Sequence, residues 1–136
     1  MVDQDVVAEK VASLLRCIQR IRDVTRGDPN SVLDLDIQDV VVLNLQRASQ
    51  QSIDLATHVI ADLKLGLPAT LKENFILLRD AKIIDADLAE KLSHMVGFRN
   101  VAVHNYRAIN AQVIRAIITK HLGDFEDFCD RIVALV

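Results

Sequence analysis

The spacing of the apolar residues is the feature that most limits what this chain can fold into. Between residues 4 and 26, apolar side chains recur every three or four positions, with charged side chains between them. Because an α-helix turns once every 3.6 residues, this spacing places them along one helical face. The same spacing returns in the later segments, so helices are expected throughout. The apolar residues of the first segment are Val7, Val11, Leu14, Leu15, Ile18 and Ile21.

Turn-forming and helix-capping residues divide the chain into its helices. Turn formers occupy residues 27–30 and 66–68, while Asp36, Asp85 and Asn110 are residue types that cap a first helical turn. The chain has only four Gly and two Pro, too few for the many turns of an all-β fold. We therefore predict an all-α fold, a single four-to-five-helix antiparallel bundle that occupies residues 1–136 as one domain. The expected helices cover residues 4–26, 36–65, 71–82, 86–104 and 110–122, with Gly123 marking a bend before a last apolar segment.

The second predicted helix suggests contact with another chain. A helix of about thirty residues would be ~45 Å long. That is too long for a small globule unless the helix bends or packs against a second chain. This helix therefore offers a surface for a homodimer.

The composition bears on location and on partners. Met1 is followed by Val-Asp-Gln-Asp, which is not a secretory signal, and no apolar run is long enough to span a bilayer. Cys17 and Cys129 lack metal-type spacing and are expected to be buried and reduced, so we predict a cytoplasmic protein. No phosphate-binding loop or zinc motif is present, and neither a metal nor another cofactor is predicted.

Residues 97–106 contain the side chains best suited to catalysis or ligand binding. Arg99, Asn100, His104 and Tyr106 lie within eight positions, and Tyr106 is the only tyrosine of the chain. On a regular helix Asn100 and His104 would share a face, whereas Arg99 and His104 would differ by about 140°. Either the helix ends near His104, or the two side chains approach a cleft from its two sides. A packed helix has no structural need for this cluster, which therefore predicts a functional site.

These residue types suit the cleavage of a phosphodiester in RNA. Such cleavage needs a base for the 2′-hydroxyl proton, an acid for the leaving oxygen, and a cation for the phosphate. An imidazole has a reference pKa of ~6.5 and serves as either base or acid, and a guanidinium matches phosphate oxygens. One histidine does not easily do both, so a two-fold dimer with two copies of His104 is expected. Because the net charge is −3, RNA binding would depend on a local basic patch, for which the candidates are Arg47, Arg107 and Arg115.

The cluster resembles a known family. Arg99 and His104 match the Arg-x4–6-His motif of HEPN domains, and Tyr106 completes the Arg-x4-His-x-Tyr form found in HepT toxins. The likeness extends over about residues 35–136. The chain departs from the family at Asn105, where an acidic residue is frequent, and at Lys82, where a glycine is common. Further similar stretches are Leu45-Gln46-Arg47-Ala48, Ile53-Asp54-Leu55-Ala56, His58, Pro68, Phe75-x-x-Leu78 and Met95-x-Gly97-Phe98.

The resemblance implies a toxin of a toxin–antitoxin pair. Members of the family are metal-independent ribonucleases, built as helical dimers with the motif at the dimer cleft. The implied partner is a minimal nucleotidyltransferase of the MntA type, which silences the toxin by transferring AMP to the motif tyrosine, here Tyr106. The implied catalytic residues are Arg99 and His104, with Asn100 in support. A second hypothesis stays open, in which the chain is a non-catalytic helical partner of a nucleotidyltransferase and the cluster is a binding surface.

Overall fold

Helices account for the regular structure of the whole chain. The computed structural model describes residues 1–136 and contains six α-helices, two short 3-10 helices and no strands. The predicted all-α bundle is thereby confirmed, with one more helix than expected. The elements are α1 (Gln4–Thr25), η1 (Pro29–Leu33), α2 (Leu35–Leu63), α3 (Glu73–Asp80), α4 (Ala86–His104), η2 (Tyr106–Ala108), α5 (Ala111–Lys120) and α6 (Leu122–Val133).

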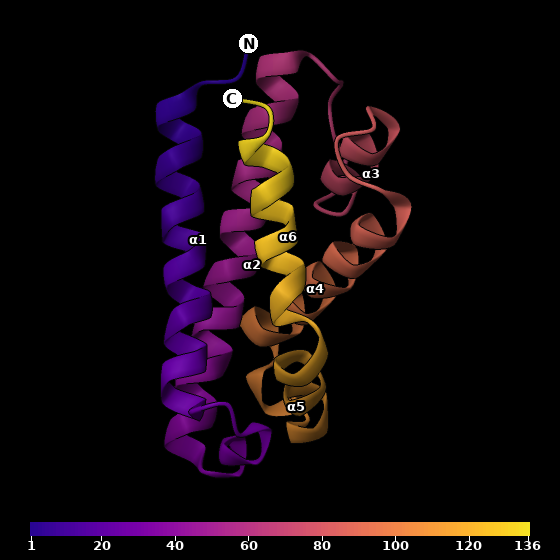
Figure 1. The fold of residues 1–136 in the computed structure, drawn as a ribbon. Helices are drawn as coiled ribbons and strands as arrows, with labels where there is room; N and C mark the ends of the chain where they lie inside the picture. The colour runs from indigo at the N-terminus through magenta and orange to yellow at the C-terminus, as the bar shows by residue number, and fades with distance from the viewer.

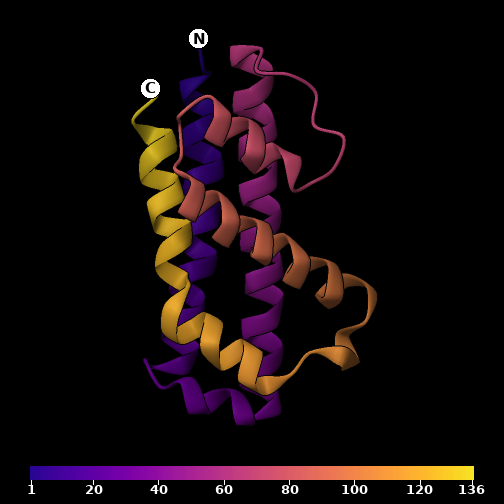
Figure 2. The same ribbon diagram turned by 90° about the vertical axis from the view of Figure 1, so that its right-hand side faces the viewer.

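Two long helices set the shape of the molecule. In Figure 1, α1 and α2 run antiparallel along its whole length, and α6 lies beside them. Figure 2 shows α4 crossing this group obliquely, so that its last turn and η2 project from the side of the bundle. The 29 residues of α2 therefore need no second chain, because α1 packs along them and α4 crosses them within the same chain. The length of α2 thus no longer argues for a dimer.

One hydrophobic core joins all six helices. It contains 32 buried residues, and aliphatic side chains make up most of it. Phe75 of α3 and Phe128 of α6 pack edge to face, with ring centroids 5.8 Å apart. Cys17 and Cys129 are both free and buried, as expected. No helix combines the length and apolar composition required to cross a bilayer.

The helix caps agree with the sequence at two positions and differ at a third. Asp85 accepts a hydrogen bond from the backbone N–H of Leu88 at 2.8 Å, which caps α4. Asn110 accepts one from the N–H of Gln112 at 2.7 Å and caps α5. The cap of α2 is Asp34 and not Asp36, because Asp34 accepts from the N–H of Asp36 at 2.8 Å. Asp36 instead lies in the first turn, where a negative charge faces the free amides.

The expected bend near the C-terminus lies earlier than Gly123. The helical backbone is interrupted at His121, whose φ of −123° and ψ of −4° are not helical. The His121 Nδ1 lies 2.8 Å from Oδ2 of Asp124, a contact that fixes the first turn of α6. The helix expected at residues 71–82 is also shorter, since α3 begins at Glu73 and ends at Asp80.

The turn after α3 contains a strained residue. Lys82 is exposed and has a φ of 62°, in the left-handed region that disfavours a residue with a Cβ. Its N–H donates to the carbonyl of Arg79 at 2.9 Å, and the next N–H, of Ile83, donates to Leu78 at 3.0 Å. Glycine is the usual residue for this helix ending.

Replacing Lys82 with Gly is therefore expected to stabilise the fold. Relief of the left-handed strain outweighs the added freedom of the unfolded chain, and we expect a gain of about 1 kcal/mol. Urea unfolding followed by circular dichroism would measure it. Glu90→Gly, at an exposed interior position of α4, is the matched control and should lose about 1 kcal/mol. Equal loss of stability in both variants would contradict the strain at Lys82.

Candidate functional site

The last turns of α4 hold the motif in a regular helix. The helix remains regular to its end, since the N–H of Asn105 donates to the carbonyl of Val101 at 2.8 Å. The buried side chains of Val96 and Ala102 attach this segment to the core. Of the two sequence alternatives, the helix ends at His104. On this regular helix Asn100 and His104 share a face, and Arg99 lies about 140° away from His104.

Arg99 and Asn100 are both half-buried, and a hydrogen bond joins their side chains. Arg99 Nη1 donates to Oδ1 of Asn100 at 3.0 Å. Arg99 Nε is buried and has no hydrogen-bond partner. A buried donor left unpaired costs about 1–3 kcal/mol, so this arrangement is not one that stability alone would favour. The hydrogen bond to Asn100 instead fixes the guanidinium in a position from which its outer N–H groups can bind an anion.

His104 is the last residue of α4 and points its imidazole toward solvent. It is exposed, and no hydrogen bond or ion pair holds its ring. A free imidazole at a helix end is accessible to a substrate and to a proton donor or acceptor on it. Within one chain, therefore, a hydrogen bond joins Arg99 with Asn100, and none connects either residue with His104.

Tyr106 is held by a residue that the sequence did not identify. It begins η2 immediately after the helix, and it is 42% exposed. Its hydroxyl donates to Oδ1 of Asp39 on α2. Burial, together with this hydrogen bond and the charge of Asp39, raises the pKa of Tyr106 to about 12. Asp39 lies 67 positions away in the sequence, so no local pattern could have pointed to it.

The three arginines proposed for RNA binding lie on different elements. Arg47 is exposed on α2, where it lines a groove between α1 and α2. Arg107 is exposed in η2, beside Tyr106. Arg115 of α5 is already engaged, since its Nη1 donates to Oδ1 of Asn30 at 2.9 Å. No hydrogen bond connects these residues with the Arg99–Asn100 pair.

Removing the carboxylate of Asp39 is expected to lower the pKa of Tyr106. In Asp39→Asn the negative charge is gone, so the phenol should ionise below 12. The pKa should stay above its ordinary value of 10, because burial is the larger cause and remains. The tyrosinate absorbance reports this one group, since the chain has one Tyr and no Trp. Asp36→Asn, on the same helix, is the control, and an equal shift there would argue against the contact.

Comparison with known proteins identifies the family of this chain. The family model described as "Ribonuclease HepT-like" matches residues 14–132. The mRNA nuclease HepT of Shewanella oneidensis is 38% identical over 130 residues, which cover 96% of this chain and 98% of that protein. The tRNA nuclease HepT of Aphanizomenon flos-aquae is 38% identical over 74 residues, covering 54% of this chain and 50% of that protein.

The structural comparison agrees with the sequence. A tri-AMPylated HEPN toxin of Shewanella oneidensis, solved in complex with an MNT antitoxin, superposes with a TM-score of 0.91. It is 39% identical, and the match covers 97% of this chain and 99% of that one. The all-α bundle with its motif at the end of α4 is thus a HEPN domain. Within that class, the chain belongs to the HepT-like ribonuclease family.

Proposed function

We propose that this protein is a ribonuclease toxin of a HEPN/MNT toxin–antitoxin system, and that it cleaves RNA without a metal ion. The observation that carries the proposal is the cluster at the end of α4. There a half-buried guanidinium held by Asn100, an exposed imidazole and a carboxylate-bound tyrosine follow one another. The relatives named as mRNA and tRNA nucleases support it.

In the proposed reaction the 2′-oxygen of a ribose attacks the adjacent phosphorus. His104 takes the 2′-hydroxyl proton as base, or gives a proton to the departing 5′-oxygen as acid. Arg99 stabilises the negative charge that develops on the phosphate, and Asn100 orients its guanidinium. The bond to the 5′-oxygen breaks, which leaves a 2′,3′-cyclic phosphate and a 5′-hydroxyl.

A homodimer would supply the second histidine and complete the cleft. Apolar side chains left exposed beside the motif support this assembly. Val101 is 41% exposed, Val103 42% and Val113 49%. Two mainly apolar grooves of about 250 and 290 Å³ lie between α4 and α5; Phe98 and Val113 line both, and Val101 lines the second. Apolar surface of this kind favours association with another chain.

The proposed regulation acts on Tyr106. An antitoxin nucleotidyltransferase of the MntA type would join the Tyr106 oxygen to the α-phosphate of ATP and release pyrophosphate. The tyrosine is accessible for this, being 42% exposed. The added adenylate brings a negative phosphate and a bulky nucleoside to the end of α4. The phosphate competes for Arg99 or Arg107, and the nucleoside blocks the approach of RNA.

The decisive test is RNA cleavage in excess EDTA by protein expressed without its antitoxin. We expect cleavage to proceed, because the proton transfers and charge stabilisation come from His104 and Arg99. The products should carry 2′,3′-cyclic phosphate ends, which phosphatase treatment alone does not remove. A requirement for added Mg²⁺ would contradict the proposed mechanism. Absence of cleavage by a folded, unmodified dimer on several RNA classes would favour the non-catalytic partner instead.

A further inference from the structure

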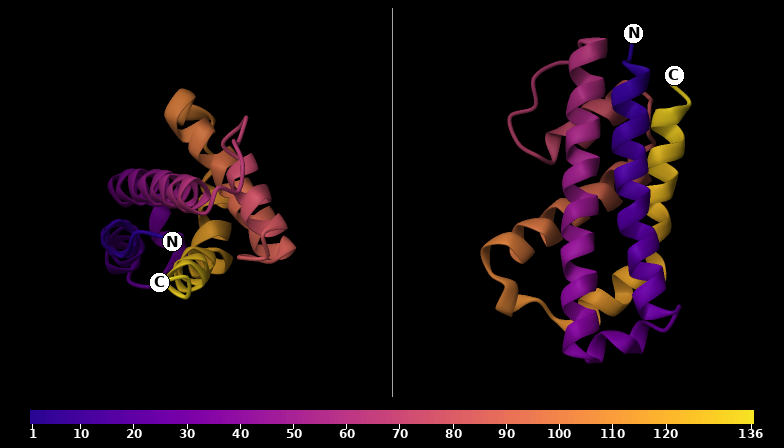
Figure 3. Two further views of the ribbon diagram at one scale, coloured as in Figure 1. Left: turned by 90° about the horizontal axis from the view of Figure 1, so that it is seen from above. Right: turned by 90° about the vertical axis from the view of Figure 1, so that its left-hand side faces the viewer.

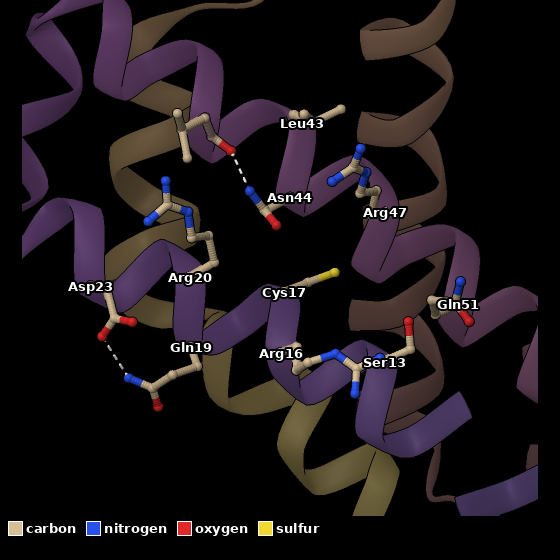
Figure 4. Close-up of a pocket in the computed structure, with 11 residues that line it drawn as sticks. Ser13, Arg16, Cys17, Gln19, Arg20, Asp23, Leu43, Asn44, Arg47 and Gln51 are labelled. Atoms are coloured by element: carbon tan, nitrogen blue, oxygen red, sulfur yellow. Dashed lines mark hydrogen bonds between the residues drawn. The ribbon is translucent and has the colours of Figure 1, made fainter. Parts of the chain in front are cut away.

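A hollow outside the motif lies between α1 and α2. It has a volume of about 880 Å³ and is open to solvent. Figure 3 shows the face on which these two helices run side by side. Arg16 and Arg20 of α1 and Arg47 of α2 line the groove together. Figure 4 shows these three side chains around Cys17.

The charge of this groove is not neutralised by neighbouring groups. None of the three guanidiniums of the groove has a carboxylate within 4 Å or a hydrogen bond to the protein, whereas Arg22, Arg79 and Arg131 on other faces are paired. The only acidic residue that lines the groove is Asp23, which accepts a hydrogen bond from Gln19 at 2.9 Å. The groove is therefore a local positive region on a chain whose net charge is −3.

The guanidiniums face a common space. Cys17 lies on α1 within the groove, and the charges of Arg47 and Arg16 both act on its thiol. Burial is the larger influence and still raises the pKa of Cys17. Arg16 and Arg20 are four positions apart, so they stand on one helical face about 6 Å apart along the axis. This spacing is comparable with that of neighbouring phosphates along a nucleotide strand.

Other lining groups suit the sugar and base of a nucleotide. Gln51 lines the groove and its Oε1 has no partner within the protein, so the amide group of this side chain can bind a ribose hydroxyl or a base edge. Val40 and Leu43 provide an apolar wall, and Leu43 is 43% exposed. An inorganic phosphate would use the arginines alone. A polynucleotide would use all of these groups.

The groove also leads toward the motif. Asp39, which binds the hydroxyl of Tyr106, precedes the groove residue Val40 in α2. Asp39 and Leu43 lie four positions apart, on one face of that helix. The α2 wall of the groove thus extends to within about one helical turn of the residue that holds Tyr106.

We propose that the groove of Arg16, Arg20 and Arg47 binds the backbone of single-stranded RNA and guides it toward the end of α4. This inference rests on the proposed ribonuclease function for its choice of ligand. RNA outside the cleaved position would contribute affinity here, and chemistry would remain with Arg99 and His104. The groove arginines therefore act on binding of substrate and not on the chemical step.

The test measures binding without cleavage. A fluorescent 2′-O-methyl RNA oligonucleotide lacks the attacking hydroxyl, so its anisotropy reports affinity alone. The triple variant Arg16→Gln/Arg20→Gln/Arg47→Gln is expected to bind at least 10-fold more weakly than wild type. Its affinity should also depend less on salt, with the log–log slope smaller by about 2 for three lost phosphate contacts. The control Arg26→Gln/Lys64→Gln/Arg79→Gln makes the same change in net charge outside the groove and should keep most of the affinity.

The outcomes separate this inference from the ribonuclease proposal. Loss of affinity in the groove variant, with a raised KM and an unchanged kcat for a cleavable RNA, would support the guiding groove. Equal loss in both triple variants would show attraction by net charge only and overturn it. Unchanged RNA binding with lost binding to the antitoxin would assign the groove to a protein partner and also overturn it. If wild type binds the oligonucleotide through the groove yet cleaves nothing in EDTA, the ribonuclease proposal fails and the groove stands.

Discussion

His104→Ala is expected to abolish RNA cleavage almost completely. General acid or base catalysis by a positioned side chain contributes about 10²- to 10⁴-fold, and the variant should lose a factor of this size in excess EDTA. The fold should be unaffected, because the imidazole is exposed and makes no hydrogen bond. Initial rates on a labelled RNA, with thermal unfolding as a check of the fold, would measure both effects.

A matched control separates catalysis from the loss of any histidine. His58 lies on α2, remote in sequence from the motif, and its Nε2 is 3.0 Å from Oδ2 of Asp62. His58→Ala should keep cleavage within a few-fold of wild type. Mixed dimers of wild type and His104→Ala test whether one cleavage needs both copies of His104. They should lose activity if each cleavage uses one imidazole from each protomer. Full cleavage by purified His104→Ala in EDTA would remove His104 from the mechanism.

Tyr106→Phe is expected to keep RNA cleavage and to lose its inhibition by the antitoxin. The phenylalanine ring preserves the shape at the start of η2 but has no oxygen to accept the adenylate. The variant should therefore cleave RNA, yet remain active after incubation with the antitoxin nucleotidyltransferase and ATP. Wild-type protein under the same treatment should gain the mass of adenylate and lose cleavage by at least 10²-fold, because the adenylate phosphate competes for arginine.

The readouts for Tyr106 are intact mass and cell growth. Co-expression with the antitoxin should rescue cells that carry wild type and fail to rescue cells that carry Tyr106→Phe. Asp39→Asn is a second variant for comparison with Tyr106→Phe. It keeps the tyrosine oxygen and removes only the carboxylate that binds it. Modification of Tyr106→Phe to the same mass as wild type would place the adenylate on another residue.

The helices and the motif were predictable because their signals are local. Apolar spacing and capping residues act within one or two turns of the chain, so Asp85 and Asn110 were correctly identified as caps. Asp34 and Asp36 are both suitable capping residues in the sequence. The choice of Asp34 depends on the backbone of η1, which ends at Leu33. The bend was predicted at Gly123, and the structure has it two residues earlier, at His121.

The positions of the functional side chains likewise depend partly on local sequence and partly on tertiary packing. The sequence alone determined that Arg99, Asn100, His104 and Tyr106 stand together at a helix end, because they lie within one short segment. Only the tertiary structure decided that Asp39 holds Tyr106 and that Arg16, Arg20 and Arg47 share a groove. Those contacts depend on how α1, α2 and α4 pack against one another. That packing is set by core residues spread over the whole chain, and no local pattern encodes it.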